Sequence, residues 1–423
     1  MTRSLVRSIR GHPFAMATVV CVGTLLGQSG CGAIERAEWK RRYLDRPGGL
    51  QGGQVTHFAE VVGEHEQPFE LNLTFDPREF DDSVALVSEV GRVTVYTDAD
   101  RAAIDQPLAD RLADRYDRAR QSAFVDLGID SPLRVVIRII YLPESPTRYH
   151  VSSPFYDDTY VAIHFVADEP LSGAVDYDRL YLDMHELVEI TLTDPTVPPV
   201  ALPDASGQFL GLIPFESRNR TRWFRDGLAT YGAYRAATVV DPDLPEKTGL
   251  FGHPLSSLAG VGPGLFDWHQ DQPRPSRDEY NASFGLFLLL EQRYGMEAIR
   301  SAIQAAGEVD YPDGPALVAA VNGALGIDLR QAVASFDFPQ WSLRYNDRGE
   351  VWGVEVLDPS WVDGLQVGDL VIFADERLIQ STLALELAWL EAREQRRPLE
   401  LSIWRDGQAI GVTAYPALTA HRQ

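Results

Sequence analysis

Hydrophobic and polar residues alternate along several short segments in the first half of the chain. Alternation with a period of two, or a run of β-branched residues, predicts strands at residues 69–75, 93–96, 134–142 and 160–166. Between the second and third of these strands, apolar residues recur at the spacing of one helix face, at Leu108, Leu112, Tyr116 and Ala119. Strands on both sides of one helix predict an α+β fold.

The pattern becomes helical after about residue 178. Residues 180–192 are apolar nearly all round, which is typical of a buried helix. Helical spacing of apolar residues predicts further helices at residues 221–239, 280–294, 296–306, 314–325 and 329–336. Two loose stretches, 194–217 and 241–277, are expected to connect these helices.

Strand-like segments return after residue 342. The pattern predicts strands at 351–356, 370–373 and 399–403, with a helix at 382–394 and a turn at 405–407. The sequences GLQVGDLVIFADERL and WRDGQ in this region resemble the bacterial PDZ family over nearly its full length. The resemblance implies a PDZ-like domain at 341–418, a small β-sandwich or barrel with one helix, with a short loop at 345–349. Domains of this family hold a peptide or protein terminus as an added strand, so such termini are the expected partners.

Composition limits the classes of function. The chain has 423 residues and a formal net charge of −23, which fits two or three domains with their own cores. A face that binds nucleic acid needs clustered Lys and Arg, so the acidic balance predicts no nucleic-acid partner. The same balance argues against holding anionic lipid by surface charge.

The N-terminal residues differ from the rest of the chain. Basic residues precede an apolar run at 15–27, which is shorter than the ~20 residues of a membrane-spanning helix. With Cys31 following small residues, the segment resembles a bacterial lipoprotein signal. The resemblance implies a signal peptide at 1–30, a lipid on Cys31, and a tether at 31–66 that anchors the protein to a membrane of the cell envelope, the outer one in an organism with two. Ordinary secretion, with Cys31 as a leftover thiol, is the alternative.

The residues most suited to chemistry lie in the sequence HELVE. On a helix, His185 and Glu189 lie one turn apart and address a common point, with Glu186 beside them. Two ligands at this spacing with an acid between them are typical of the zincin His-Glu-x-x-His motif, here His-Glu-x-x-Glu. The later sequences WFRDGLATY, at 223–231, and YNASFGLFLLLEQRYG, at 280–295, resemble helices of gluzincin metallopeptidases of the peptidase MA-like or glycyl aminopeptidase type.

This second resemblance implies a gluzincin-like domain at 67–340, in which a small mixed sheet precedes a helical half. Carried over to this sequence, the implied metal ligands are His185, Glu189 and Asp226, with Glu186 as the general base and Tyr280 as a donor to the oxyanion. The implied cofactor is a divalent metal, either zinc or a harder ion such as manganese, because two of the three ligands are carboxylates.

Two functions remain open. Two carboxylates and one imidazole carry one negative charge more than the family's ligand set, which lowers the Lewis acidity of a bound metal. We therefore expect a hydrolytically impaired protein or a pseudoenzyme that binds peptides or proteins, either with a bound metal or without one. The alternative is an active metallopeptidase that uses zinc or another ion. In a protein without the metal, His185 and Glu189 would form a hydrogen-bonded pair in the core, and Tyr280 would be ordinary core packing.

Overall fold

The computed structural model describes residues 54–55, 73–74, 80–129, 133–141, 150–156, 159–166, 180–181, 183–185, 187–188, 221–241, 251–268, 277–309, 314–339, 343–347 and 352–416. The predicted signal peptide, Cys31, Glu186 and Glu189 lie outside these residues. The chain forms two compact units, residues 1–79 and 80–423. In the first unit, strand β1 (Gln54–Val55) pairs antiparallel with β2 (Leu73–Thr74). Strand β2 is the part of the strand predicted at 69–75 that the structure describes.

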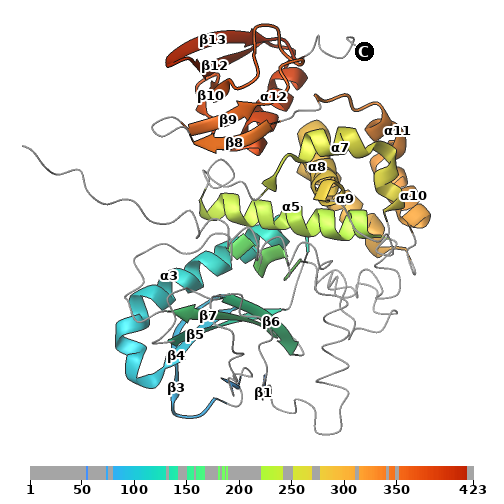
Figure 1. The fold of residues 1–423 in the computed structure, drawn as a ribbon. Coiled ribbons are helices and arrows are strands. Elements are labelled where there is room, and N and C mark those ends of the chain that lie inside the picture. The colour runs from blue at the N-terminus through green and yellow to red at the C-terminus, as the bar shows by residue number, and fades with distance from the viewer. Residues whose placement is uncertain are drawn as a thin grey trace, which may run out of the picture. The chain divides into compact units, whose positions relative to one another are not determined.

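A five-stranded mixed sheet begins the second unit (Figure 1). In sheet order its strands are β3 (Val84–Val90), β4 (Val93–Asp98), β5 (Arg134–Tyr141), β7 (Thr159–Val166) and β6 (His150–Tyr156). Strand β5 pairs in parallel with β4 and β7, while β3 and β6 pair antiparallel at the two edges. Parallel neighbours need a crossover connection, and helix α3 (Ala102–Arg120) lies between β4 and β5 and packs on β3 and β4. The predicted strands at 93–96, 134–142 and 160–166 are confirmed, and so is the helix.

Helices dominate the middle of the second unit. The described residues of the segment 180–188 are helical and largely buried, as predicted. The other helices are α5 (Arg222–Val240), α7 (Pro254–Val261), α8 (Arg277–Tyr294), α9 (Met296–Gly307), α10 (Gly314–Leu325) and α11 (Leu329–Ala334), with a 3-10 turn at Gly262–Asp267. Helix α7 was not predicted and lies within the stretch expected to be loose. Within the described part of the chain, no helix has both the length and the apolarity that crossing a membrane requires.

Helix α8 approaches α5 and α7 closely because two glycines lie at the crossing points. A Cβ atom on Gly227 of α5 would lie 2.8 Å from the carbonyl oxygen of Ser283 on α8. A Cβ atom on Gly285 of α8 would lie 2.3 Å from the carbonyl oxygen of Pro254, the first residue of α7. Figure 1 shows α7 beside α8. These helices therefore pack at a spacing that a side chain at either glycine would prevent.

The C-terminal module consists of a six-stranded antiparallel sheet and one helix. The main path of the sheet runs in the order β13-β12-β10-β9-β8, with β11 paired to β10. The elements are β8 (Leu343–Asp347), β9 (Trp352–Val356), β10 (Leu370–Ala374), β11 (Arg377–Leu378), α12 (Thr382–Glu394), β12 (Leu399–Arg405) and β13 (Gln408–Ala414). Separate sheets beside a helical region confirm the predicted α+β class.

One expectation for the C-terminal module is wrong. Residues 345–347 were assigned to a loop, but they belong to β8, in which Tyr345 pairs with Val354 and Asp347 with Trp352. The alternation in this segment was weak, and the pairing with β9 imposes the extended conformation. The predicted strands at 351–356, 370–373 and 399–403, the helix at 382–394 and the turn at 405–407 are confirmed.

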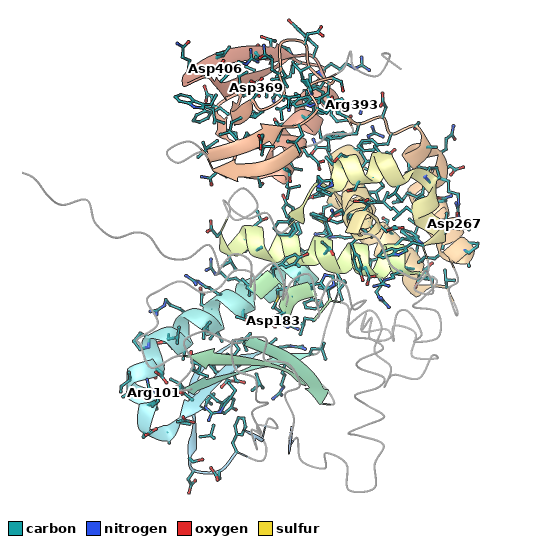
Figure 2. The ribbon with its side chains drawn as sticks, in the orientation of Figure 1. Arg101, Asp183, Asp267, Asp369, Arg393 and Asp406 are labelled. Carbon is teal, nitrogen blue, oxygen red and sulfur yellow. The ribbon has the colours of Figure 1, made fainter. Side chains whose placement is uncertain are left out.

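An ion pair fixes the loop that leads into β10. The guanidinium of Arg405 donates two hydrogen bonds of 2.6 Å to the two carboxylate oxygens of the buried Asp369, which is labelled in Figure 2. Asp369 also accepts a hydrogen bond from the backbone N–H of Gln366. Bidentate pairs of this kind are among the stronger side-chain hydrogen bonds, so they secure the turn between β9 and β10.

Helix α12 is joined to α7 by side-chain hydrogen bonds. The carboxylate of Glu386 accepts from the backbone N–H groups of Leu255, at 2.8 Å, and Ser256, at 3.0 Å, and from the Ser256 hydroxyl, at 2.5 Å. One turn earlier on α12, the Thr382 hydroxyl donates to the carbonyl oxygen of Gly252 at 2.5 Å. Glu386 thus caps the first turn of α7 from another element, satisfying N–H groups that have no partner within their own helix.

Candidate functional site

The candidate site is built on the first turns of α5, where Asp226 is completely buried. Its Oδ2 atom accepts a hydrogen bond of 2.5 Å from Arg222 Nε. Its Oδ1 atom accepts two hydrogen bonds from Arg225, one from Nε at 3.1 Å and one from Nη2 at 2.9 Å. Both arginine side chains are 1% exposed, so one carboxylate and two guanidinium groups share a buried environment. We call Arg222, Arg225 and Asp226 the α5 charge cluster.

Aromatic rings enclose the Arg222 side of the cluster. The guanidinium carbon of Arg222 lies 4.8 Å from the centre of the Trp268 ring and 4.9 Å from that of Tyr280. The two rings meet edge to face, and Arg222 Nη2 donates to the Tyr280 hydroxyl. Cation–π contacts of this kind offset part of the cost of burying a charge. Tyr280 is predicted as a donor to an oxyanion, but in the structure both its ring and its hydroxyl contact Arg222.

The cluster keeps Asp226 ionised. Burial acts to raise the pKa of Asp226, but the charges of Arg225 and Arg222, with a smaller contribution from His185, hold that pKa below its ordinary value. A carboxylate with a lowered pKa is a weak base. Asp226 is therefore unsuited to accepting a proton at neutral pH.

His185 contacts α5 one turn beyond Asp226. Its Nδ1 atom lies 3.3 Å from the hydroxyl oxygen of Thr230, and this hydroxyl donates to the backbone carbonyl of Asp226 at 2.8 Å. The only proton of the Thr230 hydroxyl is used in that second bond, so in the His185 contact Thr230 accepts. We infer that His185 carries a proton on Nδ1, which it donates to the Thr230 hydroxyl.

A second buried carboxylate positions the helical segment that carries His185. Asp183, labelled in Figure 2, is fully buried, and its Oδ2 atom accepts a hydrogen bond of 2.5 Å from the Tyr116 hydroxyl on α3. The ring of Tyr181 packs against Phe251. These contacts fix the segment against α3 and against the residues that lead into α7.

The structure brings together part of the predicted ligand set. His185 reaches Asp226 through Thr230, whose hydroxyl contacts the His185 ring and donates to the Asp226 backbone carbonyl, and Tyr280 reaches the same cluster through Arg222. Glu186 and Glu189 lie outside the described residues. Across the part of the chain that the structure covers, no three His, Cys, Asp or Glu side chains are grouped as a metal site. The predicted roles of these residues therefore stay predictions.

Sequence reasoning missed the two arginines and Asp183. The spacing of Arg222 and Asp226, four residues apart, was a signal for an ion pair on one helix face. A polar pair at this spacing usually lies on a solvated face, whereas this one is in the core. Its burial depends on Trp268 and Tyr280, which are distant in sequence.

Comparisons with known proteins give only a weak similarity to solved structures. No family model matches the chain, and no curated protein sequence matches it. Among solved structures, an aminopeptidase N family protein from Idiomarina loihiensis is similar with a TM-score of 0.34 and 11% sequence identity. The similarity covers 78% of this chain and 66% of that chain, so this chain spans slightly less than two thirds of that protein.

Proposed function

We propose that the protein is a gluzincin-like protein that has lost hydrolysis and binds peptides or proteins in the cell envelope. One observation carries the proposal: the carboxylate that would be the third metal ligand, Asp226, is the shared ion-pair partner of Arg222 and Arg225. In this account the guanidinium groups supply the positive charge that a metal supplies in the hydrolases.

The charge cluster suits a divalent cation poorly at Asp226. A carboxylate accepts about four hydrogen bonds, and three of those positions on Asp226 are taken by the arginines. A divalent ion bound there would sit within a few ångströms of two buried guanidinium groups, where repulsion is weakly screened. Removing Arg222 or Arg225 would leave the buried carboxylate of Asp226 with a single arginine partner.

A specific observation favours the alternative, an active metallopeptidase. The Thr230 contact engages Nδ1 of His185, and a histidine that binds a metal through one ring nitrogen commonly donates the N–H of the other to such a partner. In that case His185 and Glu189 would hold the metal, which would activate water, and Glu186 would accept its proton. Asp226 would take part only if its arginine partners moved.

We further propose a cellular location and a class of partner for the protein. A lipid on Cys31 would hold the protein at a membrane of the cell envelope through the 31–66 tether. The C-terminal module would act as the PDZ-like domain and hold a peptide or protein terminus by strand addition. The β8 edge supports this role, because in the described sheet β8 pairs with β9 on one side only.

A peptidase assay tests the proposal. The purified chain, supplied with zinc, manganese or calcium, is incubated with a mixture of internally quenched fluorogenic peptides. We expect no cleavage above that of His185→Ala and Glu186→Gln, because the proposed site lacks a usable metal ligand at Asp226. Cleavage that a chelator removes and that both variants lack would overturn the proposal and establish the metallopeptidase.

A further inference from the structure

Strand β13 is at one end of the C-terminal sheet, and β8 is at the other (Figure 1). All seven residues of β13 pair with β12, from Gln408 with Arg405 to Ala414 with Leu399. In the described part of the chain no strand pairs with the other side of β13, so a row of backbone N–H and C=O groups is unpaired there. Unpaired edges of this kind join other strands readily, and most proteins protect them.

The two sheets of the second unit have three other end strands, and each carries a feature that limits strand addition. The pairing of β3 with β4 shifts register between Leu86 and Ser88. The pairing of β6 with β7 shifts at Pro154, which has no N–H to donate. Strand β8 has five residues, of which Arg344 and Asp347 are charged, so a strand added there must match these charges.

Strand β13 has none of these features. Its sequence, QAIGVTA, contains no charged residue and no proline. Its pairing with β12 runs without a register shift, and six of its seven residues are exposed or half-buried. A regular, uncharged edge strand tends to associate with another strand unless a specific partner covers it. We therefore expect this edge to have a partner.

The turn before β13 determines which of its backbone groups are available. Asp406 and Gly407 both have positive φ, 49° and 81°, as in a two-residue type I′ hairpin turn. The pair of residues that closes such a turn exchanges both of its hydrogen bonds, and every second pair after it does the same. The N–H and C=O groups of residues 409, 411 and 413 therefore point away from β12, toward the unpaired edge.

These outward groups are complementary to a second copy of the same strand. In an antiparallel pair centred on Gly411, this residue lies opposite its own copy and Ala409 lies opposite Thr413 of the other strand, so that all the outward groups form hydrogen bonds. In the same register Ile410 lies opposite Val412 of the second copy. Both of these side chains are half-buried against the core, and pairing would cover their exposed parts. No like charges meet, because β13 has none.

We propose that β13 pairs with β13 of a second copy of this chain, so that two C-terminal sheets join across a two-fold axis at Gly411. The inference goes beyond the proposed function and leaves the β8 edge, at the other end of the strand order, available to a peptide. One pair of seven-residue strands is a small contact, so the dimer forms only at high protein concentration. Repulsion between two chains of net charge −23 weakens it further at low salt.

Substitutions of Gly411 test the pairing without disturbing the single chain. A Cβ atom at Gly411 would meet nothing within 4 Å. Gly411→Lys would place two lysines opposite each other in the dimer, and Gly411→Glu would place two glutamates there. Gly411→Ser is the neutral control. Gly323→Lys makes the same charge change on α10, where a Cβ atom also meets nothing.

Sedimentation velocity of the full chain over about a hundredfold range of concentration measures the association. For the wild type, Gly411→Ser and Gly323→Lys, we expect the mass to rise from that of one chain toward that of two, more steeply at high salt. Gly411→Lys and Gly411→Glu should each associate about tenfold more weakly. An equimolar mixture of these two variants should associate about as strongly as the wild type, because each lysine then faces a glutamate.

The mixture makes the test specific to this pairing. It also shows that both charged variants are folded, since a misfolded chain could not restore the dimer. A wild type that stays monomeric at every concentration would overturn the proposal, and so would association that both charged variants retain at wild-type strength. Association of the wild type without recovery in the mixture would overturn the antiparallel pairing at Gly411.

Discussion

Replacing Asp226 by Asn is expected to lower the free energy of unfolding by about 3–5 kcal/mol. The substitution keeps the size of the side chain but removes the negative charge with which Arg222 and Arg225 form ion pairs. Two buried guanidinium charges would then lose this counter-charge in a region that excludes water. Urea denaturation followed by tryptophan fluorescence measures the change, since Trp223 and Trp268 are both in the core around the cluster.

A matched control separates the effect of burial from the effect of the residue types. Asp114 and Arg118 on α3 have the same residue types and the same spacing as the Asp226 pair, but Asp114 is 58% exposed. Asp114→Asn should therefore change the free energy of unfolding by less than about 1 kcal/mol. A loss at Asp226 no greater than that at Asp114 would contradict the structural role of the α5 charge cluster.

Replacing Gly285 by Ala is expected to cost about 2–4 kcal/mol of the free energy of unfolding. The new methyl group would lie 2.3 Å from the Pro254 carbonyl oxygen and 2.7 Å from its carbonyl carbon, so α7 and α8 would have to separate. Backbone atoms at the start of α7 cannot turn aside as the end of a side chain can. Thermal or urea unfolding measures the loss.

Gly323 in α10 provides the control for this substitution. A Cβ atom there would meet nothing within 4 Å. Gly323→Ala should therefore stabilise the protein by about 0.4–1 kcal/mol, through helix propensity and a less flexible unfolded chain. If Gly285→Ala and Gly323→Ala have the same effect, the close approach of α7 to α8 is not a determinant of stability.

Much of the helical part could be predicted because its sequence signals are local. The predicted and observed bounds of α10 and α12 agree, since each has a clear apolar face and a boundary residue; Ser381, for example, caps α12 by accepting from the backbone N–H of Ala384. Helix α7 was missed because it is short and lies among glycines and prolines. Its first turn is capped by Glu386, which no local pattern indicates.

Strands at sheet edges were harder to predict. Strand β3 has a single buried residue, and its Val87 is only half-buried against the core. The alternation of apolar and polar residues therefore gave little signal for this strand. Strands β6 and β8 are likewise at the ends of their sheets. In edge strands the pairing partner, rather than an apolar face, imposes the extended conformation.

The helices that carry His185 and Asp226 were predicted, but the contacts of these two residues were not. The sequence predicted a buried helix at His185 and a helix at Asp226, and both residues lie on buried helical segments. The pairing of Asp226 with Arg222 was not predicted, because a sequence does not show that Trp268 and Tyr280 enclose the guanidinium. The resemblance to gluzincins implies that Asp226 is a metal ligand, whereas its contacts make it the counter-ion of Arg222 and Arg225.

A zinc titration by isothermal calorimetry distinguishes a metal centre at His185 from a charge cluster at Asp226. The wild-type chain and His185→Ala are each stripped with chelator, dialysed and titrated with zinc. We expect no stoichiometric zinc binding that depends on His185, because Arg222 and Arg225 already provide the positive charge beside Asp226. One zinc ion per wild-type chain, lost in His185→Ala, would contradict it and make the site a metal centre.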